Sequence, residues 1–355
     1  MKSLLRNIAI VLTIGLLAIS CKVLEAPFSD GDSSNAGVTL YPYVENYKVG
    51  FVDAEMTSRI QPQFQLLDTG MWPYTFSEGL AAVSLSGAAG YINKEGNIAI
   101  QPRFQEAHPF SEGRALVKSN GQYGFIDGSG RFVIDPRFSQ AHSFKNGRAA
   151  VQQTSGGSWG YINRNGEFVI EAQFSAAENF SDGRALIQTA DHREWGYINR
   201  AGAMVIEPQY RDAKSFSDGR APVQLGFHQW GYIDTDGETI IASKFIEADP
   251  FSEDIAAVAM PENSTNLDQR KYGYINTEGQ FIVSPSYEEA YAFHEGRALI
   301  QKNGKFGYVN PQGNLVIDPI YDRAWPFKDG LALVQLSNKY GYINKRGIFV
   351  FGPTQ

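Results

Sequence analysis

A four-residue word, Gly-Tyr-Ile-Asn, recurs along the chain and constrains its fold more than any other feature. The nine copies are 34 to 42 residues apart. A fixed period in this range indicates a repeat architecture, in which each unit packs mainly on its neighbours. A chain of 355 residues can therefore fold without one oversized core. The word or a close variant begins at Gly50, Gly90, Gly124, Gly160, Gly196, Gly231, Gly273, Gly307 and Gly341.

Each unit contains three short runs of alternating apolar and polar residues, bounded by turn residues, as in residues 297–317. This alternation is typical of β-strands. Asn303-Gly304, between the first two runs, favours a tight hairpin because both residues accept a positive φ. The sequence predicts an all-β fold of about nine three-stranded antiparallel meanders over residues 39–352. We expect another backbone or a ring to approach the middle-strand glycines closely, at Gly90, Gly124, Gly160, Gly196, Gly231, Gly273, Gly307 and Gly341.

A connector of about a dozen residues joins each unit to the next. It carries Pro-x-(Phe/Tyr), as at Pro102 and Phe104, and then Phe-x-x-Gly, as at Phe110 and Gly113. Proline donates no ladder hydrogen bond, so we expect it to end the third strand. The two aromatic residues are expected to fill the space between consecutive units. Burying each is worth roughly 1.5–3 kcal/mol, enough to hold an array without disulfides.

The repeated pattern (Trp/Tyr/Phe)-Gly-(Tyr/Phe)-Ile-(Asn/Asp), with Pro-x-(Phe/Tyr) and Phe-(Ser/Lys)-(Glu/Asp)-Gly-(Arg/Leu)-Ala, resembles the bacterial WG-repeat (KWG-repeat) family over about residues 39–352. Only Trp159, Trp195 and Trp230 supply the tryptophan that names the repeat. Other aromatic residues replace it at Tyr123, Tyr272, Phe306 and Tyr340. The family is known mainly as a binding or structural scaffold, so the resemblance implies an architecture more than a ligand.

The array begins and ends on whole units, with strands expected at Val38–Val44 and Ile348–Phe351. The sequence gives no sign that the two termini share a unit. Three strands per unit is also fewer than the four usual in β-propellers. We therefore favour an open β-solenoid or superhelix over the alternative, a closed β-propeller. A short fourth strand in the connector, around Phe174–Phe180, would favour the propeller.

The N-terminus predicts export. Lys2 and Arg6 precede an apolar run too short for a comfortable membrane span, which is the form of a secretory signal. The run ends at Leu17-Ala18-Ile19-Ser20-Cys21, with the only cysteine of the chain, and resembles a bacterial lipobox. The resemblance implies a signal peptide over 1–20 and lipid on Cys21; the alternative is an ordinary signal with an incidental cysteine. Residues 21–38 are rich in Ser, Gly and Asp and predict a flexible tether.

These features predict an exported lipoprotein of the cell envelope, facing the periplasm or the outside. The net charge of −7 argues against nucleic acid, which rewards clustered Lys and Arg, and against adsorption to anionic lipid. The expected contact with the membrane is therefore through the lipid on Cys21 alone. Expected partners are a protein or a glycan of the envelope.

The chain carries no H-E-x-x-H motif, P-loop or dinucleotide fingerprint, and we predict neither catalysis nor a cofactor. Paired carboxylates for glycoside hydrolysis stay open, since spacing in sequence does not fix distance in space. His108 and His142 occupy equivalent positions in neighbouring units, but no third ligand is evident, so no metal site is predicted.

Arginines follow the connector glycine at Arg114, Arg148, Arg184, Arg220 and Arg297, and in four copies an acid lies two residues earlier, at Glu112, Asp182, Asp218 and Glu295. These residues could form a charged stripe that contacts a ligand. We favour ion pairs within each turn, exposed to solvent and worth little.

Function is expected where copies differ. The outliers are the insertion Pro261–Lys271, the connector Leu67–Tyr74, and Trp325. Possible ligand-binding residues are Trp72, Trp159, Trp195, Trp230 and Trp325, as platforms for a glycan or peptide; terminal capping of the array is the alternative. We expect a macromolecule-binding scaffold. Second is a carbohydrate- or cell-wall-binding protein, favoured by an exposed row of Trp159, Trp195 and Trp230. Third is a hydrolase with its site on one unit.

Overall fold

The computed structural model describes residues 38–45, 48–65, 75–189, 193–263 and 266–354. The regular secondary structure in these ranges consists of β-strands alone, which confirms the all-β prediction. No helix in them is long and apolar enough to cross a membrane. The predicted signal peptide 1–20, Cys21, the tether up to residue 37, and Trp72 lie outside the described residues.

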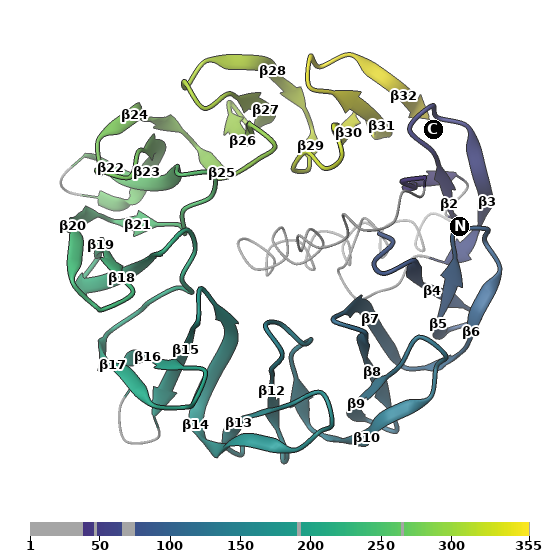
Figure 1. Ribbon diagram of the computed structural model, residues 1–355. Helices are drawn as coiled ribbons and strands as arrows, with labels where there is room; N and C mark the ends of the chain where they lie inside the picture. The colour runs from purple at the N-terminus through teal and green to yellow at the C-terminus, as the bar shows by residue number, and fades with distance from the viewer. Residues whose placement is uncertain (1–37, 46–47, 66–74, 190–192, 264–265, 355) are drawn as a thin grey trace.

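The repeats form blades arranged in a ring (Figure 1), which we number in chain order. Blades 1 to 3 contain β1 (Tyr41–Glu45), β2 (Lys48–Val52), β3 (Ser58–Gln65); β4 (Leu80–Leu85), β5 (Ala88–Asn93), β6 (Ile98–Phe104); and β7 (Glu106–Ser111), β8 (Arg114–Ser119), β9 (Gln122–Ile126), β10 (Phe132–Phe138). Blades 4 to 6 contain β11 (Gln140–Ala141), β12 (Ala149–Gln152), β13 (Trp159–Ile162), β14 (Phe168–Ser181), which continues into blade 5; β15 (Arg184–Thr189), β16 (Trp195–Asn199), β17 (Met204–Tyr210); and β18 (Arg220–Gly226), β19 (Gln229–Asp234), β20 (Thr239–Phe245). Blades 7 to 9 contain β21 (Glu247–Ala248), β22 (Ala256–Asn263), β23 (Asn266–Ile275), β24 (Phe281–Tyr287); β25 (Glu289–His294), β26 (Arg297–Lys302), β27 (Lys305–Val309), β28 (Leu315–Tyr321); and β29 (Arg323–Ala324), β30 (Leu331–Leu336), β31 (Lys339–Asn344), β32 (Phe349–Thr354).

The three-stranded antiparallel meander is present in every blade, but most blades gain a fourth, inner strand from the connector. β14 runs through both the third strand of blade 4 and the connector, and its second half pairs with β15, where Ala177 lies opposite Ile187. This strand over Phe174–Phe180 is the feature that favours a propeller. In Figure 1 the inner strands β7, β21, β25 and β29 lie toward the centre of the ring, and β6, β10, β20 and β24 toward its outside.

The prediction of an open array is wrong, because blade 9 packs against blade 1. Tyr41 meets Tyr342 with 5.5 Å between ring centroids, and Tyr43 meets Phe351 at 5.4 Å. These rings share one buried cluster with Trp325. The physical reason is the shape of the blade. A short inner strand, two residues in β11, faces a long outer strand, so each blade is a wedge and a row of wedges curves until its ends meet.

The predicted roles of the glycines and the connector aromatics are confirmed. A Cβ on Gly160 would lie 2.7 Å from the carbonyl oxygen of Ile170, because the outer strand bulges toward the middle strand there. The middle-strand Tyr161 meets the connector Phe180 of the next blade at 5.0 Å between centroids, and both are buried. The same contact recurs from blade to blade, so aromatic rings wedge neighbouring blades together.

The connector prolines do not end the third strand as expected. Pro102 lies inside β6 and Pro136 inside β10. These are the outermost strands of their blades, where one edge has no partner strand in the sheet. A proline there forfeits no ladder hydrogen bond, and it blunts an edge that could otherwise pair with another chain.

The ring has two unlike faces, because successive strands run in opposite directions. One carries the Phe-x-x-Gly turns and the Asn/Asp-x-x-Gly turns, and we call it the turn face. The Phe-x-x-Gly turns are all two-residue turns, from Ser77–Leu80 to Lys328–Leu331. The other turns all close with a hydrogen bond from residue i to residue i+4, from Asp53–Thr57 to Asn344–Ile348. The turn face is therefore level.

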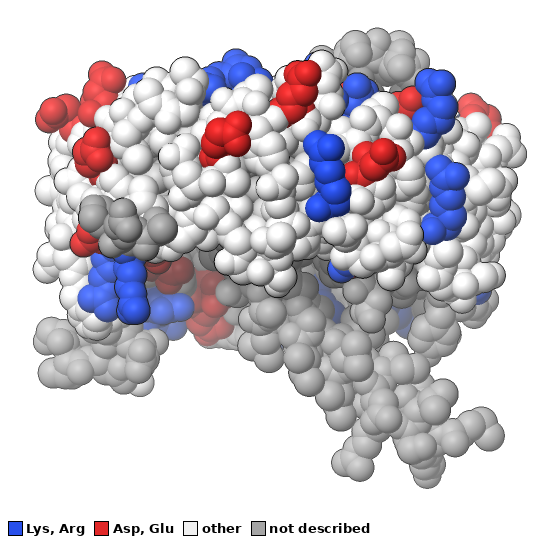
Figure 2. Space-filling view, turned by 90° about the horizontal axis from the view of Figure 1, so that it is seen from below, with Lys and Arg blue, Asp and Glu red and all other residues white. Residues whose placement is uncertain are grey.

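The opposite face, the connector face, carries the connectors and the hairpins between the first and second meander strands. The differences in repeat length fall in these segments, and the insertion Pro261–Lys271 lengthens the β22–β23 hairpin. Around the outside of the ring, the wall seen in Figure 2 is largely uncharged, with basic and acidic side chains interspersed.

Candidate binding surface

The tryptophans predicted to bind a ligand are used mainly for packing. Trp159, Trp230 and Trp325 are 8%, 6% and 8% exposed, and Trp195 is partly buried against the core between blades 5 and 6. Trp159 packs edge-on against His142, and Trp325 fills the seam between blades 9 and 1. These four indoles therefore form no exposed row for a glycan.

The two histidines lie in the connectors, and His108 has one carboxylate, that of Glu106, within 4.0 Å. His108 Nε2 is 4.0 Å from Glu106 Oε2, and burial lowers the pKa of His108. Among the described residues, no group of three His, Cys, Asp or Glu side chains could hold a metal ion.

The acids of the turn face bond across blades, whereas arginines such as Arg114 and Arg148 donate to a backbone carbonyl of their own turn. Glu112 forms an ion pair with Arg164 of blade 4 at 2.9 Å, where a partner in Arg114 was expected. The same carboxylate accepts a 2.8 Å hydrogen bond from the N–H of Gly147 in the next turn. Equivalent bonds run from Gly219 to Asp182 and from Gly330 to Glu295. These carboxylates therefore tie blades together.

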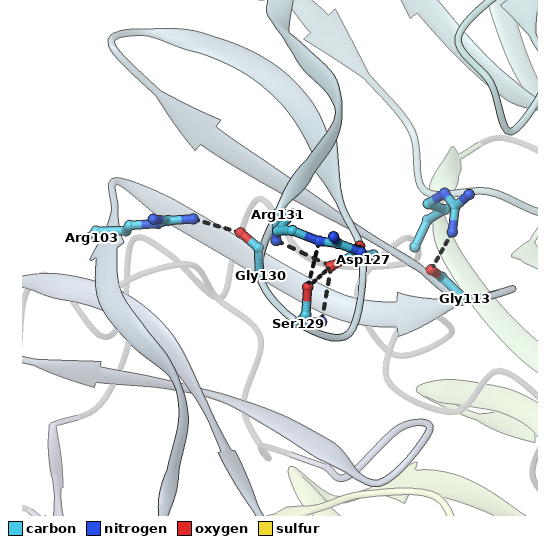
Figure 3. A network of polar contacts seen from close by, with 7 residues as sticks. Arg103, Gly113, Asp127, Ser129, Gly130 and Arg131 are labelled. Carbon is cyan, nitrogen blue, oxygen red and sulfur yellow. Dashed lines mark hydrogen bonds and ion pairs between the residues drawn. The ribbon is translucent and has the colours of Figure 1, made fainter.

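Figure 3 shows how one such turn is held, in blade 3. Asp127 Oδ1 accepts a 2.5 Å bond from the Ser129 hydroxyl, and Asp127 Oδ2 pairs with Arg131 at 3.1 Å. Arg103, from blade 2, donates to the carbonyl oxygen of Gly130 at 2.5 Å. These recurring contacts are structural, so a functional surface is better sought among residues that do not recur.

The hairpin of blade 6 carries such residues at its tip. Phe227 is 65% exposed and Leu225 is 45% exposed. The guanidinium of Arg211 lies 4.9 Å from the centre of the Phe227 ring, and the His228 ring meets the same ring edge-on at 4.1 Å. Burial of such an exposed aromatic side chain is a typical source of binding energy in protein interfaces.

Next to it, the insertion extends the β22–β23 hairpin of blade 7 on the same face, where Pro261 pairs with Arg270 and Asn263 with Asn266. The two hairpins belong to adjacent blades (Figure 1). We call residues 225–228 and the β22–β23 hairpin together the crest.

Charged groups near the crest form pairs between blades 6 and 7 and within blade 7. Lys214 Nζ of blade 6 pairs with Asp249 Oδ1 of blade 7 at 2.5 Å. Glu247 accepts a 2.6 Å bond from the Tyr272 hydroxyl and pairs with Arg270 at 3.3 Å. Burial raises the pKa of Glu289 in blade 8, and the negative charge of Glu247 adds to that rise. The crest thus combines exposed apolar groups with paired charged groups nearby, a mixture typical of protein-binding surfaces.

Sequence reasoning singled out the insertion but missed Phe227. A signal was available: equivalent hairpins turn on polar pairs such as Asn120-Gly121 and Asn303-Gly304, whereas blade 6 has Leu225-Gly226-Phe227-His228. Comparing the hairpins with one another, rather than looking for tryptophan, would have identified it.

Comparisons with known proteins agree with this architecture. The model of a family described as "WG containing repeat" matches seven times, at residues 90–123, 123–155, 159–191, 195–226, 230–260, 272–306 and 306–340. No curated protein matches the chain.

Among solved structures, one titled as the eukaryotic initiation factor superposes with a TM-score of 0.60 at 9% identity, covering 89% of this chain and 96% of that chain. At that identity the likeness shows the fold alone. BamB from Moraxella catarrhalis gives a TM-score of 0.45 at 14% identity, covering 78% of this chain and 94% of that one.

Proposed function

Because the chain belongs to the WG containing repeat family and its recurring residues join the blades of a ring, we propose that it is a non-catalytic binding scaffold. In this proposal the ring is anchored in the cell envelope by lipid on Cys21 and holds a partner protein on its connector face. The anchor rests on the N-terminal sequence, with its short apolar run and lone cysteine.

The observation that carries the proposal is the crest. Phe227 is the most exposed large apolar side chain among the described residues, and Arg211 lies against its ring. Aromatic residues and arginine are enriched in the energetically dominant parts of interfaces. A protein partner is favoured over a glycan because the four described tryptophans pack between blades instead of offering a stacking platform.

The test is a pull-down from detergent-solubilised envelopes with residues 22–355, which contain all nine blades. The crest variant is Leu225→Ser/Phe227→Ser. Its matched control is Leu315→Ser/Ile320→Ser, two side chains 42% and 49% exposed on the outer strand of blade 8. We expect wild type and control to retain the same protein, and the crest variant to lose it at least tenfold.

If the crest variant retained the partner protein as well as wild type does, the crest would not be the binding surface. A glycan array run with the same three proteins tests the carbohydrate alternative, since glycan binding without protein capture would favour it. Cleavage of model glycosides by the purified chain would favour a hydrolase over a scaffold.

The anchor is tested separately by labelling cells with a fatty-acid analogue. We expect the label and the membrane fraction to be lost together in Cys21→Ser. An unlabelled wild-type chain would leave an ordinary exported protein.

A further inference from the structure

The turn face carries an uneven distribution of charge that neither the repeat nor the proposed function explains. Its turns have the same length in every blade, so none of the described turns projects beyond the others and the charges lie on a level surface. The division appears when the turns of blades 4 and 5 are compared with those of blades 6 and 7.

The turns of blades 4 and 5 hold five bases and two acids, a net charge of +3: Lys145, Arg148, Arg164, Arg184 and Arg200, with Glu167 and Asp182. We call this the basic half. The turns of blades 6 and 7 hold one base and seven acids, a net charge of −6: Arg220, with Asp218, Asp234, Asp236, Glu238, Glu253, Asp254 and Glu278. We call this the acidic half.

The side chains at the centre of each half are available to solvent. Lys145, Arg164 and Arg200 are exposed in the basic half. Arg164 and Arg200 also line a shallow depression with Glu112 and Asn146. In the acidic half Asp236 and Glu278 are exposed and make no ion pair among the described residues. Unpaired like charges side by side repel one another, so a partner of opposite sign would relieve this half.

We propose that the turn face docks on the turn face of a second copy of this chain. The twofold axis lies in the interface, between blades 5 and 6. It places blade 4 of each ring over blade 7 of the other, and blade 5 over blade 6. The basic half of each copy then meets the acidic half of its partner, and the contact occurs twice, as a twofold interface requires.

A second copy fits this surface better than a partner of one charge. A basic protein or an anionic ligand would satisfy one half and be repelled by the other, because the halves occupy adjacent blades. The level surface also allows two identical faces to approach without a loop in the way. The net charge of −7 opposes association at long range, so the attraction must be local and sensitive to salt. The crest lies on the opposite face and stays free in the dimer.

The experiment is sedimentation velocity on residues 22–355 at about 50 mM and about 500 mM salt. The Debye length is longer than in physiological solution at the first concentration and shorter at the second. Wild type should be dimeric at low salt and dissociate at high salt. Two charge reversals are compared, Arg164→Glu/Arg200→Glu in the basic half and Asp236→Lys/Glu278→Lys in the acidic half. Each alone should weaken the dimer at least tenfold, because the first changes the basic half from +3 to −1 and the second reduces the acidic half from −6 to −2.

Mixing the two reversed proteins should restore a dimer, since one contact then joins two unchanged halves and the other sets the new glutamates opposite the new lysines. The matched control, Arg193→Glu/Lys302→Glu, reverses two exposed charges on the connector face and should dimerise like wild type. Thermal melts monitor folding, because Arg164 and Arg200 also contact Glu112 and the carbonyl oxygen of Asn146. If the arginine variant does not fold, the Asp236→Lys/Glu278→Lys protein decides alone. A wild type that is monomeric at low salt, or a mixture that stays monomeric, overturns the proposal.

Discussion

The hydroxyl of Tyr342, in the last blade, donates a 2.7 Å hydrogen bond to the carbonyl oxygen of Pro42, 300 residues earlier in the chain. Elsewhere the same tyrosine of the repeat reaches the next connector, as Tyr197 does to the carbonyl oxygen of Lys214 at 2.8 Å. The junction between blades 9 and 1 thus has the same type of hydrogen bond as a junction between two blades inside the array. At the internal junctions the acceptor lies in the connector. At this junction it lies on β1, because β1 is the first strand among the described residues.

Truncating Tyr342 should therefore cost as much as truncating an internal tyrosine. We expect Tyr342→Ala and Tyr197→Ala each to lower the free energy of unfolding by about 3–5 kcal/mol, because each removes a buried ring and leaves a cavity. Urea denaturation measures both. A cost for Tyr342→Ala below about 1 kcal/mol, beside a large one for Tyr197→Ala, would mean that the ring is open in solution.

Adding one methyl group to a middle-strand glycine should destabilise the ring. A Cβ at Gly160 meets the backbone of β14 at 2.7 and 2.8 Å, so Gly160→Ala should cost about 1–3 kcal/mol through a forced backbone shift. The control is Gly128→Ala, where a Cβ meets nothing within 4 Å and the change should stay within about 0.5 kcal/mol. Thermal unfolding distinguishes the two, and equal melting temperatures would contradict the close approach.

Asp127 should titrate at an unusually low pH. The Ser129 hydroxyl, with help from the Arg131 backbone and side chain, lowers the pKa of Asp127 to about 2. A carboxylate with a depressed folded-state pKa stabilises the fold above its unfolded pKa. That contribution is lost as pH falls toward 2. NMR titration of the carboxyl carbon should give a midpoint near 2, rising in Ser129→Ala and unchanged in Gly128→Ala. An unshifted midpoint in Ser129→Ala would remove the hydroxyl as the main cause.

The ring should unfold in alkali through its middle-strand tyrosines. Burial raises the pKa of Tyr232, Tyr274 and Tyr308 well above 10, so each stays protonated in the fold and ionises near 10 when unfolded. Their contribution to stability is complete below pH 10 and declines as pH rises above it. We expect tyrosinate absorbance from these residues to appear together with the loss of circular dichroism. Ionisation near pH 10 with an intact spectrum would contradict their burial.

The sequence predicted the local structure well because that structure depends on neighbouring residues. The glycine of each word, such as Gly160, and the paired aromatics, such as Tyr161 and Phe180, lie where the repeat indicated. Closure could not be predicted, since it depends on how far each wedge turns. That angle follows from the connector strand. The segment in which Ala177 pairs with Ile187 is too short to show the alternation of apolar and polar residues that identifies a strand.

The candidate binding surface was predicted only in part. The insertion Pro261–Lys271 was recognised by its length, and it extends a hairpin of the crest. Tryptophans such as Trp159 were chosen because large aromatics often bind ligands, but an indole is also well suited to fill the gap between two blades. Phe227 was missed because it lies outside the repeat pattern, in a hairpin that most copies turn with polar residues.

The constant length of the turns on the turn face limits where the sequence can gain residues. A residue added there would displace one turn relative to the turns of the neighbouring blades. It would break the hydrogen bonds that backbone amides donate to the carboxylate of the preceding turn. A residue added at a hairpin tip on the other side disturbs no neighbour, as the ten-residue strand β23 illustrates. New specificity can therefore be grafted onto one side while the other keeps the circle intact.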